Sequence, residues 1–390
     1  MKTYKSTNFL PAASCVNRAI IFMLVLLVIG CKEKFDSPVP KVATGYLVVE
    51  GVINNEGDTT DIKISRTTNL GDTGKKYESG AIVNLESSNG NILQLVENAA
   101  GNYTINNLHL DTSFRYRVNI HTNSNEQYQS DFVAVRNNPP IDSINWTRDA
   151  AAVHIFINTN DPKNNTRYYQ WEYNETWEFN TLYASLKYVL PNTDYVYVYY
   201  RDGSDPQIYR CWKYNASNTI LLGSSAKLSE DIIHLPITMI PAANQKLSVL
   251  YSIMVKQFSW SKEGYEFLTR MKKNTESIGS VFDAQPSELN SNIHCTTNPH
   301  QPVVGFFNIC TIREKRIFIN SIELPGWNYK IPCIERVIAN NPDSIKREGS
   351  GLLPTNPEKS GTSIITFFAS EESCVDCRLT GTNVKPIYWP

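Results

Sequence analysis

Two cysteines near the C-terminus, Cys374 and Cys377, form a Cys-x-x-Cys pair within the stretch SCVDCRLTGTN. Such a pair can supply half of a zinc site, a redox couple or part of a disulfide framework. A zinc site usually needs a second pair of ligands at similar spacing, and the sequence has no second Cys-x-x-Cys. A thioredoxin-like motif needs a βαβ context, which the surrounding residues lack. We therefore expect structural crosslinks.

The cysteines other than Cys15 and Cys31 are candidates for disulfide bonds in an exported chain, because bridges persist in an oxidising compartment. They are Cys211, Cys295, Cys310, Cys333, Cys374 and Cys377. Six cysteines allow fifteen connectivities, and the sequence alone does not choose among them. We predict that Cys211 pairs with Cys295, and that Cys333 pairs with Cys374 or Cys377.

Nucleophile and metal patterns give little support for catalysis. His294 and Cys295 could act as a base and a nucleophile, but an oxidised structural cysteine is the better interpretation in an exported chain. Ser224 and Lys227 match the S-x-x-K pattern of penicillin-recognising enzymes, yet the companion S-D-N and K-T-G patterns are absent. None of the 6 histidines stands in a metal-ligand spacing such as H-E-x-x-H, so we predict no metal centre and no cofactor.

Two oxygen-rich stretches have a functional and a structural interpretation. Residues 158–165, NTNDPKNN, carry the ligand types of calcium, but they lack the spacing of a calcium loop and favour a β-turn. Glu172, Glu175 and Glu178 would supply the acid and base of a hydrolase. Strand alternation places Glu175 on the opposite face from the other two, and a solvated strand edge is the simpler interpretation.

An aromatic insertion at residues 180–212 is the best candidate for a ligand surface. Exposed rings could stack on a sugar or grip a peptide, because tyrosine offers contact area at a small entropic cost. The residues considered for this surface are Tyr188, Tyr195, Tyr197, Tyr199 and Trp212. The alternative is a plain strand, YVYVY, whose rings cover a neighbouring sheet.

Alternation of apolar and polar residues dominates from Gly45 onward and predicts a mainly β fold. Short strands separated by turn signals, including an Asn-Gly hairpin turn at residues 89–90, are typical of a β-sandwich. Pro139 and Pro140 disfavour both helix and central strand, so we predict a sandwich domain at 45–138 and a larger β-rich region at 139–390.

The larger region should contain one short helix near residues 262–277, with Ser261 as its N-cap and an apolar stripe along one face. Residues 340–362 are rich in proline, glycine, serine and charge, and they predict a long surface loop.

The N-terminal segment resembles a lipoprotein signal. Positive residues precede an apolar run at 19–29, which is too short to span a bilayer because spanning needs about 20 residues. Gly30 and Cys31 follow, which resembles the lipobox where bacterial signal peptidase II cuts and the cysteine is acylated. We expect a signal peptide at 1–30, a lipid anchor on Cys31 and a flexible tether at 31–44. An ordinary secretory signal is the alternative.

Several long phrases in the same order resemble the lipoprotein family catalogued as domain of unknown function 4249. They are NDPKNNTRYYQWEYNETWEF, KLSVLYSIMVKQFSWSKEGYEFL, KNTESIGSVFDAQPSELNSNIHC and CVDCRLTGTNVKPIYWP. The resemblance runs from about Leu47 to Pro390. This chain departs from the family pattern in carrying Thr382 where a second glycine is common, and in carrying Cys310, which makes Cys310 a doubtful member of any bridge.

The resemblance implies an outer-membrane lipoprotein, often encoded beside a TonB-dependent receptor, with an N-terminal immunoglobulin-like or carboxypeptidase-regulatory-like sandwich. It carries over no catalytic residue. The formal net charge of −1, without a block of lysine or arginine, argues against a nucleic-acid partner. We expect a non-enzymatic accessory or binding module whose partners are the membrane and a TonB-dependent receptor. The alternative is a surface-polymer hydrolase.

Overall fold

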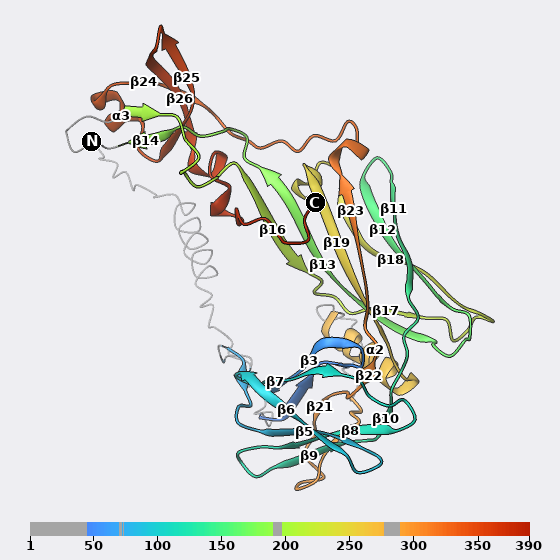
Figure 1. Ribbon diagram of the computed structural model, residues 1–390. Helices are drawn as coiled ribbons and strands as arrows, with labels where there is room; N and C mark the ends of the chain where they lie inside the picture. The colour runs from blue at the N-terminus through green and yellow to red at the C-terminus, as the bar shows by residue number, and fades with distance from the viewer. Residues whose placement is uncertain (1–44, 70–71, 73, 190–196, 277–288) are drawn as a thin grey trace, which may run out of the picture. The chain divides into compact units, whose positions relative to one another are not determined.

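Strands dominate the computed structural model, which describes residues 45–69, 72, 74–189, 197–276 and 289–390 (Figure 1). The predicted mainly β fold class is therefore confirmed. The predicted signal peptide, the tether and Cys31 lie outside the described residues. Among the residues that are described, no helix is long and apolar enough to cross a membrane.

The first sheet has eleven strands in the order β20-β9-β8-β5-β6-β7-β3-β1-β21, with β4 paired to β3 and β10 paired to β8. The strands of this sheet that precede Pro139 are β1 (Leu47–Glu50), β3 (Gly57–Arg66), β4 (Lys76–Tyr77), β5 (Ile82–Ser87), β6 (Ile92–Ala99), β7 (Asn102–Leu108), β8 (Arg115–His121), β9 (Gln127–Ser130) and β10 (Val133–Ala134). Alternate residues such as Ile62 and Ile64 of β3, and Val118 and Ile120 of β8, build one hydrophobic core. The specific immunoglobulin-like or carboxypeptidase-regulatory-like topology stays a prediction.

Three strands from much later in the chain return to this first region. β20 (Ile293–Cys295) pairs with β9, β21 (Val304–Gly305) runs parallel to β1, and β22 (Ile309–Cys310) runs parallel to β2 (Ile53–Asn54). Residues that follow Pro140 thus contribute to both regions. Local alternation predicts that a strand forms, but it does not say which strand is its partner.

A second core lies between a three-stranded and a five-stranded sheet. The first consists of β11 (Ile141–Arg148), β12 (Ala152–Asp161) and β18 (Asp231–Pro241). The second consists of β16 (Arg210–Ala216), β17 (Leu221–Ser224), β13 (Tyr168–Asn180), β19 (Leu250–Ser259) and β23 (Arg313–Asn320). Ile155 of β12, Trp171 of β13 and Ile253 of β19 are fully buried in the shared core. Odd-numbered residues of β13 face this core, and even-numbered residues face away from it.

The predicted helix is confirmed as α2 (Lys262–Glu276), and the amide of Gly264 donates to Ser261 Oγ over 3.0 Å, as an N-cap requires. Short 3-10 helices occur at η1 (Gln245–Leu247), η2 (Ser321–Glu323), η3 (Glu372–Cys374) and η4 (Cys377–Leu379).

The predicted surface loop at 340–362 is wrong. This segment contains α3 (Pro342–Glu348) and β25 (Leu352–Ser360), and β25 joins β26 (Ser363–Glu371) and β24 (Arg336–Ala339) in a small sheet. Asn341 caps α3 by accepting from the amide of Ser344 over 3.0 Å. Polar composition suggested a loop, but a capped helix and an edge strand tolerate the same residues. A two-stranded ribbon of β14 (Lys187–Val189) and β15 (Tyr197–Tyr199) comes from the aromatic insertion.

Candidate functional site

Buried amide side chains join the first region to the five-stranded sheet. Asn308 Nδ2 donates to the carbonyl oxygen of Ser259 over 2.9 Å, and Asn138 Nδ2 donates to that of Gln257 over 2.6 Å. The Gln257 side chain is fully buried, and its Oε1 accepts from Trp171 Nε1 over 2.8 Å. These contacts satisfy polar groups that would be costly to bury alone, so they fix the junction beside which a cleft lies.

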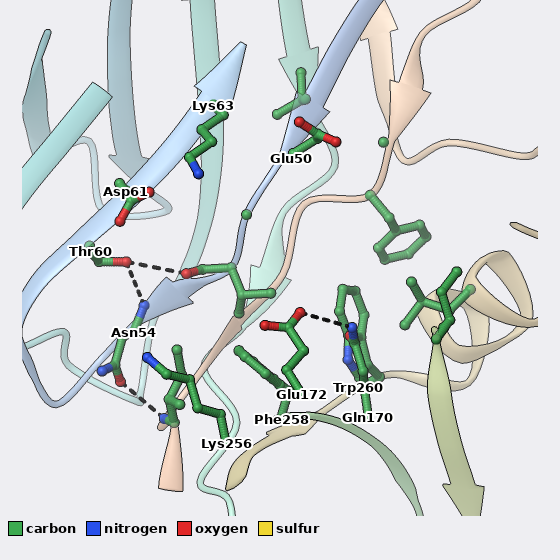
Figure 2. Close-up of a pocket in the computed structure, with 18 of the residues that line it drawn as sticks. Glu50, Asn54, Thr60, Asp61, Lys63, Gln170, Glu172, Lys256, Phe258 and Trp260 are labelled. Atoms are coloured by element: carbon green, nitrogen blue, oxygen red, sulfur yellow. Dashed lines mark hydrogen bonds between the residues drawn. The ribbon is translucent and has the colours of Figure 1, made fainter. Parts of the chain in front are cut away.

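The cleft has a volume of about 990 Å³ and two walls of different origin. One wall is formed by β1, β2, β3 and β21, and the other by β13, β19 and α2. Figure 2 shows the side chains of Glu50, Asn54, Thr60, Asp61 and Lys63 on one side, and those of Gln170, Glu172, Lys256, Phe258 and Trp260 on the other. The residues of one side lie more than a hundred positions from those of the other side in the sequence, so only the fold brings the two groups together.

Of the three glutamates singled out in the sequence, Glu172 is the one that lines the cleft. It lies opposite Lys256 of β19, which in turn lies opposite Glu314 of β23. Lys256 Nζ pairs with Glu314 at 2.9 Å, whereas Glu172 receives a long hydrogen bond of 3.3 Å from Gln170 Nε2. Burial by the cleft walls raises the pKa of Glu172, and the nearby ammonium groups of Lys256 and Lys63 oppose this rise. Glu172 therefore offers a polar, partly desolvated group to a ligand.

The other end of the cleft is aromatic. Trp260 is 5% exposed, and its Nε1 has no hydrogen-bond partner among the described residues. Its ring packs edge-on against Phe306, with the ring centroids 6.2 Å apart. A Cβ at Gly264 would come within 2.7 Å of a Trp260 ring carbon, so only glycine allows α2 to approach this closely.

A second hollow, of about 420 Å³, continues along the same face of the five-stranded sheet. It shares Asn174 and Ala216 with the cleft. Its other lining residues are Glu175, Thr176, Tyr214, Asn215, Met254, Arg316 and Tyr388. The Arg316 guanidinium lies 3.7 Å from the centroid of the Tyr388 ring. The residues Tyr214 and Tyr388 are 54% and 43% exposed.

The other two candidate carboxylates are structural, and the predicted solvated strand edge is wrong, because β13 is an internal strand. Glu175 is 1% exposed and accepts from Lys246 Nζ, Tyr251 OH and Asn215 Nδ2 at 2.6, 2.8 and 2.8 Å. These three donors occupy most of the acceptor positions of the carboxylate. Glu175 therefore lies on the core face and is not available to a substrate.

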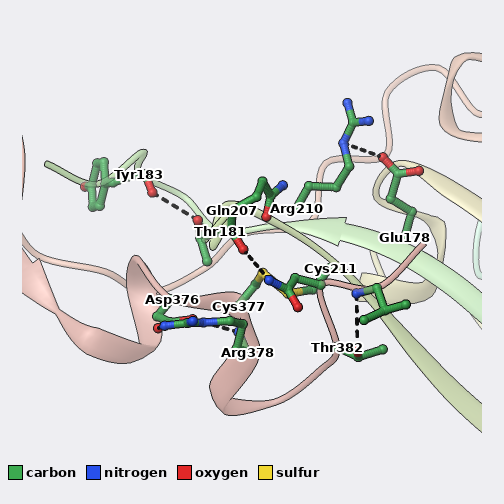
Figure 3. Close-up of a disulfide and its surroundings, with 12 residues drawn as sticks. Glu178, Thr181, Tyr183, Gln207, Arg210, Cys211, Asp376, Cys377, Arg378 and Thr382 are labelled. Carbon is green, nitrogen blue, oxygen red and sulfur yellow. Dashed lines mark hydrogen bonds and ion pairs between the residues drawn. A yellow bond between two sulfur atoms is a disulfide. The ribbon is translucent and has the colours of Figure 1, made fainter. Parts of the chain in front are cut away.

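Glu178 lies on the opposite face of β13, close to the disulfide shown in Figure 3. It is 7% exposed, accepts from Trp389 Nε1 over 2.9 Å and pairs with Arg210 Nε at 3.1 Å. Its side chain is covered by the C-terminal segment and does not line the cleft.

Two disulfides fix the Cys-x-x-Cys segment. Cys333 pairs with Cys374, as one of the predicted alternatives states, but Cys211 pairs with Cys377. The predicted Cys211–Cys295 bond is wrong, because Cys295 lies in β20 of the first sheet whereas Cys211 lies in β16 of the five-stranded sheet. Cys295 is buried with a free thiol, and so is Cys310. Cys374 and Cys377 of the Cys-x-x-Cys segment are thus bonded to two different parts of the chain.

The predicted aromatic ligand surface is only partly within the described residues. Trp212 is wrong for this role, because it is 4% exposed and packs edge-on against Trp389. Tyr195 lies outside the described residues. The backbones of Tyr188, Tyr197 and Tyr199 lie in the ribbon of β14 and β15, so for them the surface stays a prediction.

The remaining chemical patterns have structural explanations. His294 is exposed and Cys295 is buried on opposite faces of β20, so they do not form a base–nucleophile pair. Ser224 Oγ accepts from the amide of Ala226 in a turn. Asp161 accepts from three backbone amides of its own turn, those of Lys163, Asn165 and Thr166. The described residues contain no group of three or more His, Cys, Asp or Glu side chains that could hold a metal ion.

Sequence reasoning missed most of the cleft, including Asp61, Lys63, Gln170, Asn174 and Lys256. Each looks like an ordinary polar residue on the outer face of a strand. Glu172, Lys256 and Glu314 lie side by side because of the register of β13, β19 and β23. This register is the signal that would have identified them together, and no single segment of the sequence contains it.

Comparison with known families places this chain. No curated protein sequence matches it. The model of the family described as a domain of unknown function, DUF4249, matches residues 32–316, which include both walls of the cleft but end within β23, before the disulfide-bonded C-terminal segment. The chain is therefore a member of the DUF4249 family.

Proposed function

We propose that the chain is a lipoprotein of the outer membrane that acts as a non-enzymatic binding or accessory module for a TonB-dependent receptor. The observation that carries the binding role is the cleft beside the junction of the two β regions. It combines an aromatic end, a partly desolvated carboxyl group at Glu172 and polar side chains from both walls. Ligand sites are typically concave, with a few polar groups that fix the ligand's orientation.

The state of the three glutamates of β13 argues against the hydrolase alternative in the form predicted, with the acid and the base both on this strand. A glycosidase-type mechanism needs two carboxyl groups that face one bond of the substrate. Glu175 and Glu178 are buried and paired, and only Glu172 of the three lines the cleft.

The anchor is tested by metabolic labelling with radioactive palmitate. We expect label and membrane association in the wild-type chain, because the lipobox pattern ends at Cys31. The matched variant Cys31→Ser should lose both. Retention of label by Cys31→Ser would contradict the proposed anchor.

The partner is tested by crosslinking in intact cells, purification from detergent-solubilised membranes and mass spectrometry. We expect a TonB-dependent receptor to be enriched with the wild-type chain and to be lost with Cys31→Ser, which removes the common membrane location. Recovery of the wild-type chain without any receptor would count against the accessory role.

A further inference from the structure

The two hollows form one groove along the outer face of the five-stranded sheet. Strand register places Glu172 beside Lys256 and Glu314 in one row, and Asn174 beside Met254 and Arg316 in the next. The first row lines the cleft, the second lines the smaller hollow, and Asn174 and Ala216 line both. Successive rows on one face of a sheet are about 7 Å apart. An extended ligand could therefore contact both hollows at once.

The same face is closed further along β13. Thr176 and Glu178 continue the even-numbered positions, but they are 2% and 7% exposed because the C-terminal segment covers them. Tyr388 contacts Thr176 through their hydroxyl groups at 2.9 Å, and Trp389 donates to Glu178. Glu172 and Asn174 are instead open to solvent through the groove, although its walls partly desolvate the Glu172 carboxyl group and β13 has hydrogen-bonded neighbours on both edges. The groove is thus an open stretch of sheet that ends at the C-terminal segment.

Backbone pairing cannot provide the contacts in this groove. The amides and carbonyls of β13 are used by β16, β17 and β19, so a peptide cannot add to it as another strand. The contacts must come from side chains. Gln170, Glu172 and Asn174 stand at alternate positions of β13. The amide groups of Gln170 and Asn174 can both donate to and accept from a ligand hydroxyl group, and the carboxylate of Glu172 can accept from one.

The exposed tyrosines of the second hollow and the charged residues of the cleft indicate which kind of ligand fits the groove. Tyr214 and Tyr388 expose ring surface at the second hollow, and aromatic faces pack against the C–H groups of pyranose rings. Five carboxylates line the cleft against two lysines. The carboxylates are Glu50, Glu56, Asp61, Glu172 and Glu314, and the lysines are Lys63 and Lys256. Glu56 pairs with Arg313 at 3.0 Å, Glu314 with Lys256 at 2.9 Å and Glu50 with Lys75 at 3.8 Å. Arg316 also lies in the second hollow, so the charges of the groove nearly balance and offer a charged polymer little net attraction.

We propose that the groove binds an uncharged oligosaccharide that extends from Glu172 in the cleft to Tyr214 in the second hollow. This inference rests on the proposed binding role and adds the class of ligand. Asn174 contacts the ligand where the two hollows meet, Glu172 accepts from its hydroxyl groups, and Tyr214 stacks on a sugar ring at the far end.

The test is isothermal titration of the full chain, purified in detergent, with uncharged glucan, mannan and xylan oligosaccharides of two to six units. Oligogalacturonates and an unstructured peptide serve as charged and non-sugar probes. We expect at least one uncharged series to bind, with an affinity that rises with length because longer members reach both hollows. Binding of only the oligogalacturonates or the peptide, or no binding by any uncharged series, would overturn the inference.

Variants locate the site. Tyr214→Ala should weaken binding of the hexasaccharide about tenfold, the order expected for one stacked ring, and should leave the disaccharide at the cleft unaffected. Glu172→Gln should weaken both. Tyr77→Ala, which removes a similarly exposed ring from β4 of the first sheet, is the matched control and should change neither. Equal losses for Tyr214→Ala and Tyr77→Ala would place the sugar elsewhere.

Failure of this test is distinguishable from failure of the proposed function. The palmitate and crosslinking experiments measure the anchor and the receptor without any sugar, so a receptor-bound lipoprotein that ignores uncharged oligosaccharides would refute the ligand class alone.

Discussion

Trp389 Nε1 donates a hydrogen bond to the carboxylate of Glu178 over 2.9 Å, joining the penultimate residue of the chain to a strand 211 positions earlier. The Trp389 ring also packs edge-on against Phe318 of β23 and Trp212 of β16. The C-terminal segment therefore serves as a cover for one end of the five-stranded sheet, and it sets the limit of the groove.

Removing this cover should destabilise the chain. We expect Trp389→Ala to lower the free energy of unfolding by about 3 kcal/mol, because it empties a large buried site and removes one of the two donors to the Glu178 carboxylate. Ile387→Ala is the matched control, since Ile387 is fully exposed two positions away, and its effect should stay within about 0.5 kcal/mol. Urea unfolding followed by circular dichroism measures both. Equal effects of the two substitutions would show that Trp389 does not hold the segment in place.

Glu175 should matter for stability rather than for any reaction. Glu175→Ala leaves Lys246 and Tyr251 without their buried acceptor, so we expect a loss of about 3 kcal/mol in the free energy of unfolding. Glu172→Ala, on the exposed face of the same strand, should cost less than about 1 kcal/mol. Urea midpoints compare the two variants. A Glu175→Ala chain as stable as the wild type would contradict the structural role.

The two disulfides should contribute strongly to stability. On the chain-entropy model, replacing Cys211 and Cys377 by alanine should cost about 5 kcal/mol and replacing Cys333 and Cys374 about 4 kcal/mol, because the closed loops are long. Thermal unfolding without reductant measures this.

Peptide mapping of the non-reduced chain provides the control for the connectivity. It should return linked peptides for Cys211–Cys377 and Cys333–Cys374. Cys310 should react with iodoacetamide at pH 8 only after denaturation, because burial raises the pKa of its thiol to about 12 and excludes the reagent. A peptide that links Cys211 to Cys295 would refute this arrangement.

The cleft makes a prediction about pH. Burial raises the pKa of Glu172 above its ordinary value of 4.5, so its favourable contribution to stability is present below pH 4.5 and is lost as the pH rises through the raised pKa. Glu172→Gln should therefore gain stability relative to the wild type at pH 7 and lose that advantage at pH 4. Urea unfolding at the two pH values gives the difference.

Glu97 provides a control of opposite sign. Hydrogen bonds from the backbone amides of Gly101 and Gly80 lower the pKa of Glu97, so its contribution is present above pH 4.5 and is lost as the pH falls. Glu97→Gln should be less stable than the wild type at pH 7, with a smaller deficit at low pH. The same pH trend in both variants would show that the cleft does not desolvate Glu172.

Local patterns predicted those features that depend on neighbouring residues. The Asn-Gly turn between β5 and β6 is confirmed, with Gly90 at φ 91°, because a positive φ is a property of one residue and its turn. Helix α2 is confirmed for the same reason, since its cap and its apolar stripe lie within one segment. The structure of residues 340–362 was harder to predict from the sequence, because a polar composition is compatible with a loop, a short capped helix or an edge strand.

The mainly β character of the chain, helix α2 and the crosslinks around Cys374 and Cys377 could be predicted from local patterns, because alternation, capping and cysteine spacing act over a few residues. Long-range contacts account for the bond between Cys377 and Cys211, and for the burial of Glu175 while Glu172 opens into a cleft. Those outcomes depend on strand register and on which distant segment covers each face of a sheet. A period-two pattern carries neither kind of information.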